Sequence, residues 1–275
     1  MRLGLIAACL PPLLAAQDPG EILRHAIEAD AQNERISRNY TFLERDDQRK
    51  LDSAGQVKER KIATWDVTLL EGSPYRRLAA RDDKPLSPDE QRKEDEKLRK
   101  SNEERRNETG EQRKLRIGEW EARRQKQRQD VRELPMAFDF HLAGDERLNG
   151  VDVWAIAGVP HPGYRARTAA ARALLPKIDC RFWISKSDYG LAKMELETLD
   201  TVSRGLFFVR LSKGSRIVLE QTRVNGEVWL PRRVTVTAGA RLLLVKGMRI
   251  DLQIDYSDYK KFQAESKIVG FQEKK

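Results

Sequence analysis

The chain has 275 residues and a formal net charge of +9, and 35% of its residues are charged. This length suits one large domain or two small ones. The excess charge is local, because residues 87–133 hold 28 charged side chains and the rest of the chain has an ordinary composition. Both signs are interleaved and no aromatic residues accompany the cationic clusters, which argues against a nucleic-acid surface.

The N-terminus has the pattern of a secretory signal. Arg2 precedes an apolar run over residues 3–16, and a polar segment follows Ala16. The run is too short to span a membrane. Residues 6–9 carry the letters of a lipoprotein box, so lipidation of Cys9 is the less favoured alternative. We therefore expect residues 1–16 to be removed and the mature chain to be exported and soluble, with Cys180 as a buried structural thiol.

The first half of the mature chain predicts one helix and a β-meander. Residues 20–38 place apolar side chains at helical spacing. Alternation then predicts strands over 39–48, 57–70 and 75–81, joined by short polar turns. His25, in the helix, has no His or Cys at a metal-binding spacing.

Residues 87–133 predict a charged helical insertion. Ser87 and Glu90 form a capping-box pattern with Pro88 between them. Residues 107–110 favour a break between an acidic arm (87–112) and a basic arm (113–132). The arms would form either an antiparallel hairpin or one long helix. The insertion is either a solvated arm or a contact for a protein partner or membrane surface, with Trp120 as its expected anchor.

Strand patterns resume after the insertion and run to the C-terminal region. They cover residues 138–146, 151–158, 206–211, 215–224, 227–237 and 242–256, with a short helix expected over 168–175. A β-hairpin over residues 179–201 has an apolar and a polar side, and Gly190 is expected at a positive φ in its turn. Pro231 predicts an edge or a bulge.

The predicted fold is mainly β with helices, an α+β architecture. About eleven antiparallel strands form a large curved sheet whose concave side is covered by helices. Residues 17–275 form a single domain. Its apolar face is either ordinary core or a surface that binds an acyl chain, since burial of each CH₂ contributes about 0.8 kcal/mol. The candidate lining residues are Trp65, Val67, Leu69, Phe182, Ile184, Met194, Leu196, Ile250, Leu252 and Ile254.

Catalytic motifs are scarce in the sequence. No metal-binding spacing, phosphate-binding glycine loop or nucleophile elbow occurs. Glu195 and Glu197 share a strand face, but a solvated face explains them. His161 near Tyr164 could act as a base in a hydrolase, which is the least favoured function. We therefore predict no catalytic residues, metal or cofactor.

The hairpin segment FWISK…GLAKME (residues 182–195) resembles the LolA/LolB-like family of outer-membrane lipoprotein-sorting proteins, with Ser185 where aspartate is usual. Residues 228–231 and 256–262 are similar to its later strands. The resemblance covers most of the mature chain except the charged insertion. It implies an incomplete barrel with a helical lid and an acyl-chain cavity.

The sequence thus supports two main hypotheses. The first is a monomeric, non-catalytic periplasmic carrier that binds lipid or lipoprotein acyl chains. The alternative is a periplasmic regulatory or scaffolding protein that engages a protein partner through residues 87–133.

Overall fold

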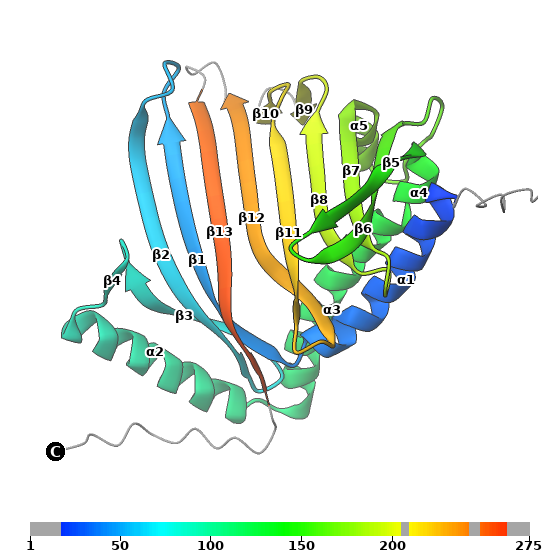
Figure 1. Ribbon diagram of the computed structural model, residues 1–275. Coiled ribbons are helices and arrows are strands. Elements are labelled where there is room, and N and C mark those ends of the chain that lie inside the picture. Colours follow the sequence, from blue (N-terminus) through cyan, green and yellow to red (C-terminus); the bar gives the residue numbers. More distant parts are fainter. Residues whose placement is uncertain (1–17, 205–208, 242–247, 263–275) are drawn as a thin grey trace, which may run out of the picture.

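The computed structural model describes residues 18–204, 209–241 and 248–262. The expected signal, Cys9 and part of the strands predicted over 206–211 and 242–256 lie outside these residues. A curved antiparallel sheet dominates the structure (Figure 1), which confirms the predicted fold class. The sheet is open, because β4 and β5 are its two edges.

The elements follow the predicted order. The helices are α1 (Pro19–Ser37), α2 (Pro88–Arg106), α3 (Gly110–Arg132), α4 (Leu134–Ala137), α5 (Ala169–Leu174) and the 3₁₀ turn η1 (Leu175–Lys177). The first strands are β1 (Tyr40–Leu51), β2 (Val57–Leu70), β3 (Ser73–Arg81), β4 (Lys84–Pro85), β5 (Phe138–Leu148) and β6 (Val151–Pro160). The others are β7 (Ile178–Ser185), β8 (Leu191–Thr198), β9 (Val202–Arg204), β10 (Val209–Leu211), β11 (Arg216–Val224), β12 (Val228–Arg241) and β13 (Met248–Lys261).

The strand order places β1 and β13, the first and last strands, side by side in the middle of the sheet. It runs β4-β3-β2-β1-β13-β12-β11-β8-β7-β6-β5, with the short β9 and β10 attached beside β12. β1 pairs with β13 over most of its length, for example Asp46 with Ile254. The charged residues 87–133 therefore connect one edge of the sheet, at β4, to the other edge, at β5.

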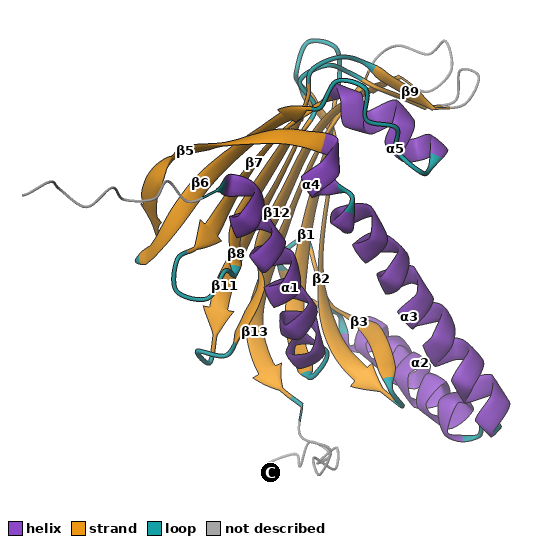
Figure 2. Ribbon diagram, turned by 90° about the vertical axis from the view of Figure 1, so that its right-hand side faces the viewer, coloured by secondary structure: helices purple, strands orange, loops and turns teal. Residues whose placement is uncertain are grey.

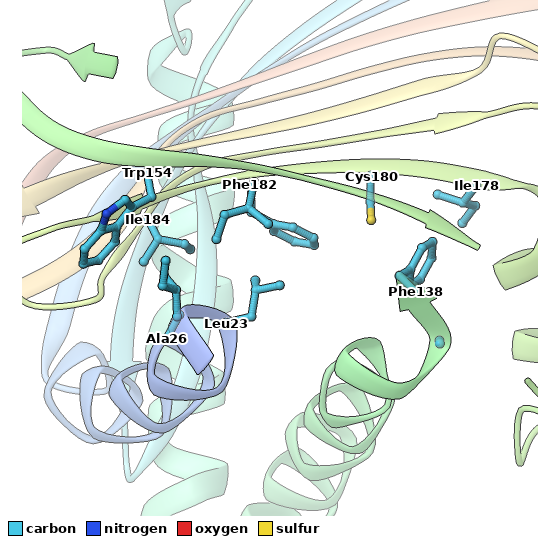
Figure 3. Close-up of a cluster of buried hydrophobic side chains, with 11 residues drawn as sticks. Leu23, Ala26, Phe138, Trp154, Ile178, Cys180, Phe182 and Ile184 are labelled. Carbon is cyan, nitrogen blue, oxygen red and sulfur yellow. The ribbon is translucent and has the colours of Figure 1, made fainter. Parts of the chain in front are cut away.

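The helices α1, α3 and α4 lie on one side of the sheet (Figure 2), and we call this side the inner face. Asp18 caps the N-terminus of α1, and its carboxylate accepts a hydrogen bond from the Gly20 amide at 2.9 Å. Its apolar stripe of Ile22, Leu23 and Ala26 packs on β5, β6 and β7. Figure 3 shows Leu23 and Ala26 beside Phe182 and Ile184, so this end of the inner face is filled core.

Over β8, β11, β12 and β13 the opposite, outer face carries ion pairs, whereas over β6 and β7 it holds the buried cluster of Val153, Ala155 and Trp183. Arg233 bonds Asp255 across β12 and β13 at 2.6 Å, and Glu195 pairs with Lys193 and Arg216 on β8 and β11. Alternating charged side chains of neighbouring strands thus meet on this face, as expected for a solvated sheet surface.

The turn of the β7–β8 hairpin differs from its prediction. Tyr189 takes the positive φ of 56°, and Gly190 does not. Glycine is required at position 190 for space, because a Cβ there would lie 2.0 Å from the indole nitrogen of Trp229. The sequence shows the glycine but not the distant tryptophan that requires it.

Candidate functional site

The inner face of β8, β11, β12 and β13 carries a continuous row of aliphatic side chains. One line of paired residues crosses the four strands as Leu196, Ile217, Val236 and Leu252, and a second crosses as Met194, Leu219, Val234 and Ile254. These eight residues and Ile250 form what we call the inner row. Alternation along each strand places all nine on one face.

The inner row is only partly covered. Ile217 is 39% exposed, and the other eight side chains are half-buried. Fully packed core residues next to them are very different, since Ile184 is 1% exposed and Phe182 4% exposed. The row therefore forms an accessible apolar surface in the middle of the sheet, beside a filled core. Such a surface suits an aliphatic ligand.

The predicted lining residues separate into three groups in the structure. Met194, Leu196, Ile250, Leu252 and Ile254 belong to the inner row. Phe182 and Ile184 lie in the core cluster beneath α1 (Figure 3).

Trp65, Val67 and Leu69 form the third group and lie on β2, beyond β1. β1 separates them from the inner row with polar side chains, including Asp46 opposite Ile254 and Gln48 opposite Leu252.

That polar border is an ordered cluster. Asp46 accepts a hydrogen bond from the Trp65 indole at 3.1 Å and pairs with Arg76 at 3.2 Å. The Arg76 guanidinium lies 4.7 Å from the centre of the Trp65 ring. Burial raises the pKa of the neighbouring Glu44 carboxyl, although Arg76 opposes this effect. The row therefore ends at a polar boundary on this side.

Four residues of the inner row were missing from the sequence prediction: Ile217, Leu219, Val234 and Val236. Their alternation in RIVLE and RRVTV is visible in the sequence. The pairing of β11 with β8 and of β12 with β13 is not visible there, and this pairing makes the row continuous.

The charged residues 87–133 form two helices that meet at residues 107–109 and diverge (Figure 1). The predicted break is correct, whereas both the single long helix and the antiparallel hairpin are wrong. α2 runs beside β3, and Arg77 bonds Asp95 at 2.7 Å. α3 runs on the inner side of the sheet toward α4 (Figure 2).

α3 is attached to the rest of the protein at two places, through Arg116 and through Arg124. Arg116 donates to the Ser73 hydroxyl at 2.6 Å and to the Glu71 carbonyl at 2.9 Å, both at the β2–β3 turn. Farther along, Arg124 pairs with Glu34 of α1 at 3.0 Å. Trp120 contacts the main body as expected, with the guanidinium of Arg38, the residue after α1, 5.7 Å from the centre of its ring. The anchoring is therefore mainly ionic.

The remaining candidates for chemistry have structural surroundings. Cys180 is 2% exposed, and burial raises the pKa of its thiol to about 12, so it is a buried, neutral thiol as predicted. His161 lies 2.7 Å from Asp139, and both side chains are about half exposed. The hydroxyl of Tyr164 donates to Glu133 at 2.7 Å. Among the described residues, no group of three or more His, Cys, Asp or Glu side chains is placed to hold a metal ion.

Within the described part of the chain, none of the helices combines the length and apolar character needed to cross a bilayer. No protein-family model matches the chain, and no curated protein matches it.

Solved structures do match the chain over most of its length. An outer membrane lipoprotein-sorting protein domain from Vibrio parahaemolyticus is 12% identical, with a TM-score of 0.33, and the match covers 90% of this chain and 94% of that one. A LolA superfamily protein from Nitrosomonas europaea is 14% identical, with a TM-score of 0.26 and coverages of 91% and 96%. The Pseudomonas aeruginosa MucA/MucB complex contains a chain that is 11% identical, with a TM-score of 0.26 and coverages of 90% and 100%. The chain is thus similar over most of its length to solved structures described as an outer membrane lipoprotein-sorting protein domain and a LolA superfamily protein.

Proposed function

We propose that the protein is a non-catalytic, exported binding protein or carrier for acyl chains, and that the inner row is its binding surface. The observation that carries this proposal is the continuity of nine partly exposed aliphatic side chains on one face of four strands. An extended acyl chain on this row would bury CH₂ groups at about 0.8 kcal/mol each. Lipid or the acyl chains of lipoproteins are the ligand class that fits.

The contrast between the two faces supports the proposal. Thr235 and Val236 are neighbours on β12, and only Val236 lies on the inner face. The outer face is stabilised by ion pairs and suits water, whereas the inner row exposes apolar area without a polar partner. α3, which crosses the inner side, would limit the access of water to a bound chain.

A first experiment asks whether the mature protein carries lipid. Protein purified without detergent would be extracted and examined by mass spectrometry, and a stoichiometric fatty acid, phospholipid or lipopeptide is expected. An empty protein that also fails to bind a fluorescent fatty acid would contradict the proposal.

A matched pair of variants locates the site. Val236→Asp places a charge in the inner row and should weaken fluorescent fatty-acid binding at least about tenfold. Thr235→Asp makes the same charge change on the outer face and should leave the affinity within about twofold of the original. Equal losses in both variants would remove the inner row as the site.

The alternative function, capture of a protein partner through residues 87–133, rests on α2. None of its residues is buried, and pairs such as Lys97 with Glu94 and Arg99 with Glu103 satisfy its charges locally. Arg105 at the end of α2 and the arginines of α3 are used within the molecule instead. If the protein is empty of lipid, the exposed surface of α2 becomes the place to search for a partner.

A further inference from the structure

A hollow lies on the outer face of the sheet, on the opposite side from the inner row. The β5–β6 hairpin folds forward over this face (Figure 1). Its tip, with β8, β11 and β12, encloses a cavity of about 450 Å³ that we call the outer hollow. A cavity of this size can hold a small organic molecule.

Cationic side chains dominate the charge of the outer hollow. Lys193, Arg223, Arg232 and Arg233 line it, and Glu220 is the acidic side chain among its lining residues. The four cations come from three different strands. The sheet therefore gathers positive charge at one place on a face where it elsewhere alternates signs.

A β-bulge explains why two adjacent arginines reach the same hollow. Glu220 pairs with Arg233 and Gln221 pairs with Pro231, so Arg232 is an extra residue on β12. Pro231 has no amide hydrogen to continue the ladder. A bulge bends a strand and changes the direction of its side chains. Regular alternation would have sent Arg232 and Arg233 to opposite faces.

Some nitrogen donors of these arginine side chains are available to bind an anion. Arg232 is exposed and has no hydrogen bond or ion pair among the described residues. Arg233 uses its Nε atom for Asp255, at 2.6 Å, and its two terminal nitrogens have no partner among the described residues. Arg223 approaches Asp188 only to 3.5 Å. Arg232 and Arg233, which both line the hollow, thus keep guanidinium nitrogens without a partner among the described residues.

One part of the wall of the outer hollow is apolar, beside the polar residues Asn149, Gln221 and Thr222. Trp229 and Ala192 are each 7% exposed, and Leu148 and Val151 of the hairpin pack against the same cluster. The hollow thus combines an apolar wall with a cationic rim. A purely ionic surface patch would lack the apolar wall.

We propose that the outer hollow binds a phosphate ester with an apolar group, the phosphate on Arg232 and Arg233 and the apolar group on the wall. Planar guanidinium groups bind phosphate oxygens in pairs, which makes phosphate the fitting anion. The ester can belong to a phospholipid or to a water-soluble molecule. The site lies on the face opposite the inner row and does not depend on the acyl-chain proposal.

Titration calorimetry of the mature protein at low salt tests the proposal with three probes. They are dihexanoylphosphatidylglycerol below its micelle concentration, phenyl phosphate and inorganic phosphate. We expect at least one ester to bind more tightly than inorganic phosphate, and its affinity to fall with added salt. Binding of phenyl phosphate would indicate a soluble ester, and binding of the lipid alone would indicate a phospholipid. Failure of both esters, or inorganic phosphate binding equally well, would overturn the proposal.

Three variants assign the binding to the outer hollow. Arg232→Glu should weaken the ester at least about tenfold, because a charge-assisted contact becomes repulsive. Lys260→Glu makes the same charge change on β13, outside the hollow, and should have little effect. Val236→Asp disables the inner row and should leave ester binding intact. Equal affinity in Arg232→Glu, or loss in Val236→Asp, would contradict the proposed site.

Discussion

Asp47 shows how single charges stabilise the outer face. It is 3% exposed and accepts hydrogen bonds from Arg60 at 2.7 Å and 2.9 Å and from Arg49 at 2.9 Å. The hydrogen bonds from Arg60 and then Arg49 hold the pKa of this carboxyl far below its usual range. Burial alone would raise that pKa, so the two arginines determine its ionisation.

We predict that Asp47→Asn lowers the free energy of unfolding by about 1–3 kcal/mol at pH 7. The folded-state pKa lies below the unfolded value of about 3.9, so the contribution is complete above about pH 5 and falls as the pH drops. Urea unfolding at pH 7 and pH 3 should therefore show a smaller difference between the proteins at pH 3. Asp251→Asn, in a more exposed pair with Arg249, is the control and should cost less than about 1 kcal/mol. A difference that grows toward pH 3 would contradict the explanation.

Gly190 is constrained by packing and not by backbone conformation. The Trp229 indole occupies the space of a Cβ at this position and donates to Asp188 at 3.1 Å. We predict that Gly190→Ala displaces the indole and destabilises the protein by about 2–4 kcal/mol, with a changed tryptophan fluorescence spectrum. Gly118, in α3, has open space at its Cβ, so Gly118→Ala should stabilise by about 0.5–1 kcal/mol. An unchanged Gly190→Ala protein would show that the indole can move without cost.

At the scale of elements, α3 is the least expected feature, because few apolar residues hold it. Arg116 contacts Ser73, the Glu71 carbonyl and both carboxylate oxygens of Glu108, at 2.6–2.9 Å. One side chain thus links the α2–α3 junction to the β2–β3 turn. Its position on α3 gives the helix a fixed starting point for its course across the inner side.

We expect Arg116→Ala to increase amide hydrogen exchange in the first half of α3, because the remaining polar groups there lose their shared cation. Lys114→Ala changes the same charge two residues earlier on an exposed position and should leave exchange unchanged. Hydrogen exchange followed by mass spectrometry compares the two. Equal protection in both variants would mean that Arg116 is not an anchor.

Local patterns predicted most elements correctly and their partners poorly. Alternation locates β2 and β8, and the capping box at Ser87 marks the start of α2. The pairing of β1 with β13 joins residues about 200 positions apart, and no local pattern encodes it. For this reason the sequence predicted five residues of the inner row but missed Val236 and its neighbours. It also could not show that residues 87–133 join the two edges of the sheet.

At the scale of the whole molecule, the sheet changes from filled core to open surface across its width. Beneath α1, side chains such as Ile156 are completely buried, whereas four strands away the aliphatic residues of the same face are half exposed. The proposed binding of an acyl chain would use both regions. The filled end supplies stability, and the open region can exchange water for ligand without unfolding.

The same substitution in a packed and an open region tests whether the inner row is open. Val153 is 0% exposed in the packed cluster around Trp183 on the outer face, and Val236 is half-buried in the inner row. Threonine has nearly the shape of valine but adds a hydroxyl, which is costly only where no water or partner can reach it. We predict that Val153→Thr lowers the free energy of unfolding by about 1–3 kcal/mol and that Val236→Thr lowers it by less than about 1 kcal/mol in lipid-free protein.

Val236→Thr should nevertheless weaken fatty-acid binding, because the hydroxyl loses water when the acyl chain covers it. Urea unfolding and fluorescent fatty-acid titration measure the two effects. Equal destabilisation by both variants would mean that the inner row is ordinary core, since an open surface tolerates the hydroxyl and a packed one does not.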